Sequence, residues 1–367
     1  MNRFSVGALA LLAWPAAAPA QGTPPDTSFR VTFGGFVDTY YAYDFGTPPT
    51  LDRSFSGGAT FTTQPARHNE FNVNLAYVEA LVSAHRIRGR LALQAGTSVQ
   101  SNYSAEPTVG VVSGPILSRM LQEAYAGYQV TPSLWVDGGI FYSHMGMESW
   151  ASKDNPIYTR SLTAEYSPYY SSGVRAIWAA TPKLTAHLHL VNGWQNISET
   201  NTDKGIGLRL DYAASSALTL TYYNFFNGET EGRQRIFNGV GTKWTPDSRT
   251  TLIGQFDFGS LEAADDGDGS TWYGFTLIGR RALSDYVAIA GRFERFDDED
   301  QVNIVTGLGD PFRGNGASIG FDVTPQSRFL WRTELRGFFA EDSVFPESGG
   351  STSTSNVFLV SSFGLIF

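Results

Sequence analysis

Apolar and polar side chains alternate along most of the chain, with the period of two that is typical of β-strands. Residues 85–97 are the clearest case, because Arg86, Arg88 and Arg90 share one face while aliphatic residues share the other. Such a strand needs water on one side and an apolar medium on the other. The same alternation predicts strands over residues 28–44, 70–83, 85–97, 118–130, 133–143, 169–180, 183–193, 204–213, 217–227, 234–245, 249–260, 270–282, 285–296, 314–323, 327–341 and 354–367.

The connections between these strands are alternately short and long. The long ones are residues 45–69, 98–117, 144–168, 194–203, 261–269, 297–313 and 342–353. Short turns on the other side repeat a Thr-Pro pair, at 131–132, 181–182, 245–246 and 324–325. Bacterial outer-membrane barrels sort their connections in this way, with short turns in the periplasm and long loops outside.

The last strand ends the sequence on the aromatic residue Phe367, with Leu365 and Phe363 on the same face. An apolar last strand suits a barrel whose final strand pairs with its first and faces lipid. We therefore predict an all-β protein, a transmembrane antiparallel β-barrel of about 16 strands with short periplasmic turns and long external loops. A barrel of this size is wide enough to enclose an aqueous channel.

The amino-terminus predicts export. Asn2 and Arg3 precede an apolar run over residues 4–18, and Ala18-Pro19-Ala20 is a small-x-small cleavage site. This pattern is typical of a secretory signal peptide, and the run is shorter than the roughly 20 residues that span a membrane as a helix. We expect residues 1–20 to be the signal peptide and residues 21–367 to form the barrel in the outer membrane.

Composition narrows the class further. Hydrophobic residues make up 42% of the chain, too few for a helical membrane protein, while 14% are aromatic, which suits the interfacial girdles of a barrel. The absence of cysteine excludes a disulfide scaffold, and the net charge of -9 argues against nucleic acid as a partner.

Alternation also predicts which polar side chains face the lumen. In residues 70–83 it places Asn72 and Asn74 on the water-facing side, and Leu75 and Tyr77 on the apolar side. The arginines of residues 85–97 form either a basic ladder that favours anions or a wall whose charges pair with carboxylates of neighbouring strands. The predicted pore-lining residues are Asp38, Asn72, Asn74, Arg86, Arg88, Arg90, Asp137, His187, His189, Arg209, Asp211, Arg292, Glu294, Arg332, Glu334 and Arg336.

Two alternatives involve histidine. His187 and His189 share an inward face and are a candidate metal pair, but the sequence offers no evident third ligand, so we expect neither a metal site nor a cofactor. His144 with Ser143 or Ser149 is a candidate nucleophile–base cluster for a lipid hydrolase. The chain contains no G-x-S-x-G elbow, and we therefore predict that the protein is not an enzyme.

Several stretches resemble one family. Residues 33–41 (FGGFVDTYY) resemble the opening strand of the OmpL-like putative β-barrel porin-2 proteins, and residues 155–162, 168–175 and 192–194 are similar to later parts of the same family. The resemblance implies an outer-membrane channel for an unidentified solute and carries no catalytic residues. In general porins of this strand count the third external loop folds inward. By that analogy, residues 144–168, with Glu148, Lys153, Asp154 and Arg160, are expected to constrict the pore.

The expected function is passive diffusion of small hydrophilic solutes or ions through a water-filled lumen. The rival interpretations are a plugged, structural barrel with an adhesion or envelope role, and an outer-membrane lipid hydrolase. The expected partners are outer-membrane lipid and lipopolysaccharide, together with the diffusing solutes, and assembly into a homotrimer is left open.

Overall fold

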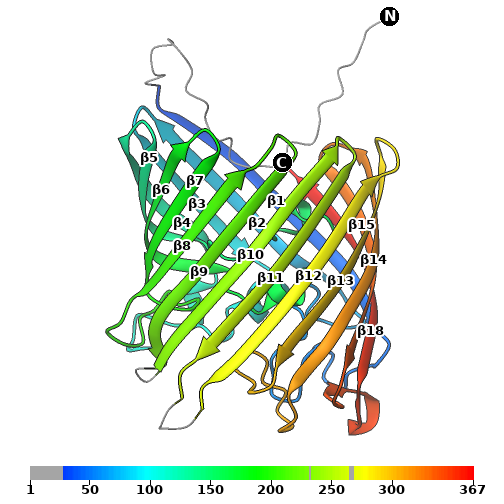
Figure 1. Ribbon diagram of the computed structural model, residues 1–367. Helices are drawn as coiled ribbons and strands as arrows, with labels where there is room; N and C mark the ends of the chain where they lie inside the picture. Colours follow the sequence, from blue (N-terminus) through cyan, green and yellow to red (C-terminus); the bar gives the residue numbers. More distant parts are fainter. Residues whose placement is uncertain (1–27, 231–232, 264–267) are drawn as a thin grey trace, which may run out of the picture.

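The computed structural model describes residues 28–230, 233–263 and 268–367, so the predicted signal peptide lies outside the described residues. Within them, 16 strands form one closed antiparallel barrel in which neighbours in sequence are neighbours in space (Figure 1). Strand β1 (Arg30–Asp44) closes the barrel against β18 (Ser355–Ile366), with Phe36 opposite Ile366. The predicted fold class and strand number are confirmed.

The other barrel strands are β2 (Phe71–Ala84), β3 (Ile87–Ala95), β4 (Leu121–Thr131), β5 (Leu134–Tyr142), β6 (Tyr170–Thr181), β7 (Leu184–Val191), β8 (Gly205–Ala213), β9 (Leu218–Thr230), β10 (Arg233–Asp247), β11 (Thr250–Leu261), β12 (Ser270–Ala282), β13 (Val287–Asp298), β14 (Phe312–Gln326) and β15 (Phe329–Ala340). The short elements β16 (Phe345–Pro346) and β17 (Thr352–Ser353) pair separately. Helices in the described residues are confined to α1 (Thr97–Asn102), α2 (Pro115–Ser118), α3 (Leu162–Glu165) and the 3-10 turns Ser152–Asp154 and Ser348–Gly350. None of these helices is long and apolar enough to cross a membrane.

The two ends of the barrel differ as the loop lengths predict. The short turns lie at the end that also holds the start of β1 and the carboxy-terminus, at the top of Figure 1, and the long connections lie at the other end. All four Thr-Pro pairs lie at or beside short turns. Strands β9 and β10 are the exception, because Thr230 and Arg233, where they end and begin on the long-loop side, are only three positions apart in the sequence.

The outer surface is a band of apolar side chains between two groups of aromatic residues. A barrel in a bilayer presents this surface to lipid, with aromatic rings at both interfaces. The exposed aromatic residues near the short turns include Phe33, Tyr128, Trp178, Tyr212, Trp244, Tyr286, Phe321, Trp331 and Phe367. Those near the long loops are Tyr43, Phe71, Phe226, Phe258, Tyr273 and Phe339.

Strand β2 departs from simple alternation. Its register against β1 shifts at Asn74, because Asp38 pairs with Leu75 while Thr39 pairs with Val73. An extra residue of this kind moves every following side chain to the opposite face. Leu75 and Tyr77 are consequently buried inside the barrel. Their predicted place on the apolar outer side is wrong, and the cause is the bulge.

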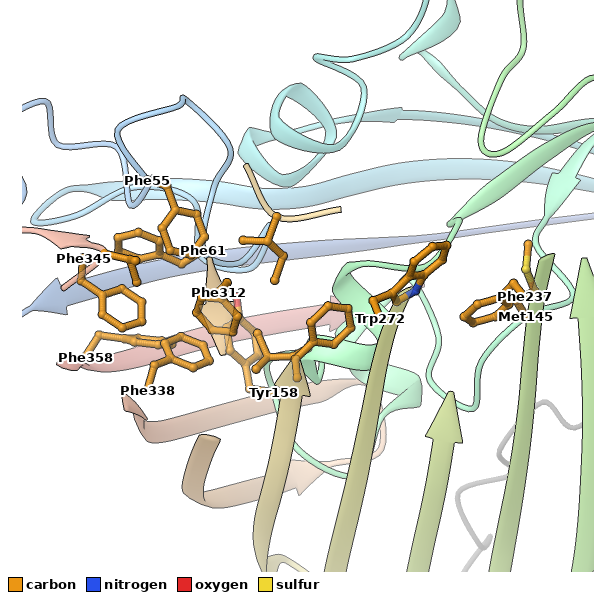
Figure 2. Close-up of a cluster of buried hydrophobic side chains, with 14 of the residues drawn as sticks. Phe55, Phe61, Met145, Tyr158, Phe237, Trp272, Phe312, Phe338, Phe345 and Phe358 are labelled. Carbon is orange, nitrogen blue, oxygen red and sulfur yellow. The ribbon is translucent and has the colours of Figure 1, made fainter. Parts of the chain in front are cut away.

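Loops fill much of the interior at the end that holds the long connections. Six phenylalanines pack there in a group that we call the phenylalanine cluster: Phe55, Phe61, Phe312, Phe338, Phe345 and Phe358 (Figure 2). The ring centroids of Phe55 and Phe61 are 4.7 Å apart, and those of Phe61 and Phe345 are 5.2 Å apart. Phe55 and Phe61 come from the connection between β1 and β2. The cluster therefore packs this loop against the inner wall at the long-loop end of the barrel.

Candidate functional site: the lumen and the third loop

The connection between β5 and β6, which we call the third loop (residues 143–169), crosses the inside of the barrel. Most of its residues are buried and none is exposed, and Thr159 and Ser161 are fully buried. A solvated surface loop would leave its polar groups to water, whereas this loop bonds to the barrel wall. Its wall partners come from eight strands: Asp38 of β1, Gln94 of β3, Arg209 of β8, Asn224 of β9, Gln255 of β11, Thr276 of β12, Arg292 and Glu294 of β13, and Arg332, Glu334 and Arg336 of β15.

The most extensive of these contacts is with β13 and β15, in a group that we call the charge clamp: Arg292, Glu294, Glu334 and Arg336. Arg292 is 2.9 Å from Glu334, Arg336 is 2.6 Å from Glu294, and all four side chains have no exposed surface. Thr159 lies at the centre of the group. Its backbone N–H and its hydroxyl donate to Glu334 at 2.7 and 2.8 Å, and its carbonyl accepts from Arg292 at 2.6 Å. The positive and negative charges balance, and the loop backbone takes up part of their remaining hydrogen-bonding capacity.

A second attachment joins the loop to β1 and β15. Asp38 accepts hydrogen bonds from Asn74 at 2.8 Å and from the hydroxyl of Ser152 at 2.9 Å. Arg332 pairs with Asp322 at 2.8 Å and donates to the carbonyl of Ser152. Both charged wall residues therefore hold the start of the 3-10 turn in the loop.

A third attachment faces β7, β8 and β9. The ring of His144 stacks on that of His189 at 4.2 Å, and its Nε2 is 2.8 Å from the carbonyl oxygen of Asn224. Arg209 donates to the carbonyls of His144 and Gly146 at 2.8 and 3.0 Å. Burial lowers the pKa of His144 from 6.5 to about 4, assisted by the nearby positive charge of Arg209. The loop is thus held here by a histidine that is neutral near pH 7.

The arginines of β3 are paired with carboxylates. Arg88 donates to Asp137 through two nitrogens at 2.7 Å, and Asp137 also accepts from Arg175 at 2.8 Å. Arg90 lies between Glu79, at 2.7 Å, and Glu123. We call this set of ion pairs on β2 to β6 the arginine wall. These ion pairs match the predicted alternative in which the arginines pair with carboxylates of neighbouring strands. They do not match the alternative of an unpaired basic ladder that favours anions.

Arg86 does not continue this row. It lies in the turn before β3, where it donates to the carbonyl of Gln129 at 2.7 Å and its guanidinium is 4.8 Å from the ring centre of the outward-facing Tyr128. Its predicted lumen position is therefore wrong. Arg86 lies just before the start of β3, and its side chain packs against the outward-facing Tyr128 instead of entering the lumen.

The remaining predicted residues lie in several environments. Asn72 is near the outer end of β2 and bonds to Glu70. His187 lies 3.9 Å from Asp211, which pairs with Arg209 at 2.8 Å. In the third loop, Lys153 pairs with Asp154 at 2.9 Å.

Arg160 is buried in the loop, Glu148 is partly buried, and both line one cavity of about 70 Å³. Burial raises the pKa of Glu148, although nearby Arg292 and a hydrogen bond from Ser161 favour its charged form.

Several residues that pair in the lumen or hold its loops were not predicted. Glu79 was missed because the β2 bulge reverses its face, and Gln94, Asn224, Gln255 and Thr276 are neutral residues of ordinary strand composition. Arg53 in the connection between β1 and β2 is fully buried, bonded to Asp44 at 2.8 Å and 3.6 Å from the ring centre of Phe358. The phenylalanines Phe55 and Phe61, in a connection predicted only as a long external loop, were the signal that this loop is also buried.

The candidate hydrolase cluster takes a different geometry. His144 faces Asn224 and His189, as described above. Ser143 accepts a hydrogen bond from the backbone of Met145 at 3.2 Å, and Ser149 accepts one from Ala151 at 3.3 Å. These contacts use the hydroxyls of Ser143 and Ser149 to shape the loop.

Comparisons with known proteins agree with this architecture. The family model described as putative β-barrel porin-2, OmpL-like, matches residues 30–367. No curated protein sequence matches. Among solved structures, a loop L8 deletion mutant of OmpT, an outer membrane protein of Vibrio cholerae, has a TM-score of 0.59 at 10% identity and covers 92% of this chain and 99% of its own.

Two further structures are similar. The outer membrane channel DcaP of Acinetobacter baumannii has a TM-score of 0.56 at 10% identity, covering 94% of this chain and 99% of its own. OmpT of Vibrio cholerae in its trimer form has a TM-score of 0.56 at 9% identity, covering 93% and 100%. At these identities the structural likeness supports the fold, and the family match carries the functional assignment.

Proposed function

Since this chain belongs to the OmpL-like putative β-barrel porin-2 family, we propose that it is a porin whose third loop controls the passage of small hydrophilic solutes. The protein is an outer-membrane porin with the closed 16-stranded barrel of that class. Solutes diffuse passively through such a barrel because polar walls replace the water around them. The proposal concerns the loop, which blocks that route when it is attached to the wall.

The observation that carries the proposal is the burial of the lumen where the loop crosses it. Inward-facing Thr276, Arg292 and Glu334 are almost completely buried, and the loop backbone lies against them. Two cavities in the described residues have volumes of about 10 and 70 Å³, room for roughly one and five water molecules. We infer that a hydrated solute needs a wider path than either cavity and that part of the loop leaves the wall during passage.

A reversible crosslink tests this proposal. The hydroxyls of Thr163 in the loop and Thr276 in β12 are 2.9 Å apart, and both residues are buried. The chain contains no cysteine, so the double variant Thr163→Cys/Thr276→Cys has only this thiol pair. We expect oxidation to abolish the conductance of the purified protein in a planar bilayer and a reductant to restore it.

The two single-cysteine variants are the matched controls, and their conductance should not respond to oxidation. Equal conductance of the oxidised and reduced double variant, with crosslinking verified by mass spectrometry, would show that solutes pass without movement of this segment. Absence of current from every form, including the wild type, would instead favour the plugged, structural barrel. Liposome swelling with small sugars provides the corresponding measurement for uncharged solutes.

The same proposal includes the absence of catalysis. The hydroxyls of Ser143 and Ser149 are engaged in the loop backbone, which supports a structural role for the His144 segment. Release of fatty acid from phospholipid by the purified protein, lost on substitution of His144, would contradict it.

Export and assembly complete the proposal. We infer that residues 1–20 are removed as a signal peptide, which the intact mass of the purified protein measures directly. The aromatic rings at both ends of the barrel support contact with outer-membrane lipid and lipopolysaccharide. A homotrimer is suggested by the trimer form of the similar OmpT structure, and native mass spectrometry distinguishes it from a monomer.

A further inference from the structure

A cavity of about 70 Å³ lies within the third loop beside the end of β5. Eight of its nine lining residues belong to the loop itself, and Tyr142 of β5 is the ninth. The volume is enough for roughly five water molecules, or for a small organic solute. The lining residues are Tyr142, Ser143, Met145, Glu148, Ser149, Trp150, Arg160, Pro168 and Tyr169.

Arg160 lines this cavity and has unused hydrogen-bond donors. Its side chain is almost completely buried, and one terminal nitrogen donates to the carbonyl of Ala164 at 2.8 Å. Its guanidinium carbon lies 3.6 Å from the ring centre of Tyr169. The other two nitrogens, Nε and Nη1, have no hydrogen-bond partner among the described residues. Buried donors of a charged group are costly to leave unpaired, and a planar guanidinium suits a carboxylate.

Glu148 brings the opposite charge to the same cavity. Its carboxylate accepts hydrogen bonds from the backbone N–H and the hydroxyl of Ser161, the former at 3.1 Å. In the part of the chain that the structure describes, neither Glu148 nor Arg160 takes part in an ion pair within 4.0 Å. One small cavity therefore presents a buried cation and a partly buried anion that are not joined in an ion pair, although Arg292 and Arg160 lie near enough to favour the charged form of Glu148.

We propose that this cavity is a subsite for a small zwitterion of the amino-acid class. The carboxylate of the solute binds Nε and Nη1 of Arg160, and its ammonium group lies toward Glu148 and the hydroxyls of Ser143 and Ser149. The rings of Tyr142, Trp150 and Tyr169 provide flat apolar walls that also favour a cation. The inference rests on the proposed function, since it names a class of solute that the loop would hold during passage.

Charge selects the zwitterion over simpler ions. An anion without a positive group would be attracted by Arg160 but repelled by the carboxylate of Glu148. A cation without a negative group would be attracted by Glu148 but repelled by Arg160. In a site from which water is largely excluded, an unmatched charge of this kind is strongly unfavourable. A solute that carries both charges satisfies both residues at once.

Calorimetric titration of the purified full-length protein in detergent tests the subsite with glycine, acetate and methylammonium as probes. We expect saturable binding of glycine that is at least tenfold tighter than that of either ion. Arg160→Gln and Glu148→Gln should each weaken glycine binding at least tenfold, and Arg160→Lys should restore part of the loss. The matched control is Arg67→Gln, a loop arginine that is already paired with Asp52 and Glu70 at 2.6 and 3.0 Å and does not line the cavity.

Acetate that binds as tightly as glycine, with no effect of Glu148→Gln, would replace this inference with a plain anion site. Absence of binding for all three probes would remove the subsite altogether. Bilayer conductance of the same preparations separates the two proposals. A protein that conducts ions and binds no glycine disproves the subsite alone, whereas one that binds glycine and never conducts disproves the gated porin.

Discussion

The charge clamp and the arginine wall are built from the same residue types on the same kind of strand, and they differ in what covers them. In the charge clamp all four side chains have no exposed surface, because the third loop lies over them. In the arginine wall, Arg88, Arg90 and Arg175 keep 10%, 18% and 13% of their side-chain surface exposed. Burial raises the free-energy cost of an unpaired charge. Arginine–carboxylate pairs therefore hold the third loop in the charge clamp, whereas in the arginine wall they line a surface that water reaches.

The largest effect should follow from breaking the charge clamp. Glu334→Gln keeps the size of the side chain but leaves Arg292 and Arg336 to share Glu294, and it weakens the bonds to Thr159. Removing one partner of a buried pair typically costs about 3–5 kcal/mol, or roughly two to four orders of magnitude in the equilibrium between attached and detached loop. We expect higher single-channel conductance and faster tryptic cleavage after Arg160. Wild-type conductance together with wild-type resistance to trypsin would contradict the assignment of the clamp.

The next effect should depend on pH through His144. Its pKa is about 4 in the attached loop and near 6.5 when the imidazole is in water, so only the detached loop takes up a proton between these values. The attachment is therefore unaffected above pH 6.5, weakens as the pH falls, and has lost about 3 kcal/mol by pH 4, roughly a hundredfold in the equilibrium.

Conductance of the wild type and of His144→Gln should thus diverge as the pH falls from 7 toward 4, with the wild type opening more. Glu148, whose pKa is raised in the attached loop, acts in the opposite direction, but it titrates in both proteins and cancels in the comparison. Parallel pH profiles of the two proteins would show that this histidine does not govern the attachment.

A smaller effect is expected in the arginine wall. Asp137→Asn removes the carboxylate between Arg88 and Arg175, but water reaches both arginines and screens the charge that is left. The loop should stay attached, so conductance and trypsin resistance should match the wild type. The uncompensated positive charge should raise the permeability of anions relative to cations by about twofold, measured as a reversal potential in asymmetric potassium chloride. Opening of the channel in this variant would show that the two walls do not differ as their exposure indicates.

The sequence predicted the barrel well because alternation, turn chemistry and loop length act locally and agree with one another. It failed at Leu75 and Tyr77 because one inserted residue reverses a face, and the strand itself carries no signal for the insertion. The pairing of Arg88 with Asp137 could be anticipated as a cross-strand contact, but the central position of Thr159 could not. That contact joins residues distant in sequence, and it depends on how far the loop reaches into the lumen.

The smallest effect tests whether burial, rather than the number of ion pairs, decides the outcome. Glu341 at the outer rim faces Arg295 at 2.9 Å and Arg313 at 3.5 Å, so it has one arginine partner more than Glu334, which pairs with Arg292 in the clamp, but half of its side chain is exposed. Exposed pairs contribute little, because water solvates each charge almost as well as the partner does. Glu341→Gln should therefore leave conductance, trypsin resistance and ion selectivity unchanged. Glu334→Gln, measured in the same way, should change conductance and trypsin resistance strongly. A comparable opening of the channel by both substitutions would mean that loss of charge anywhere loosens the loops, and the distinction between covered and uncovered walls would have to be abandoned.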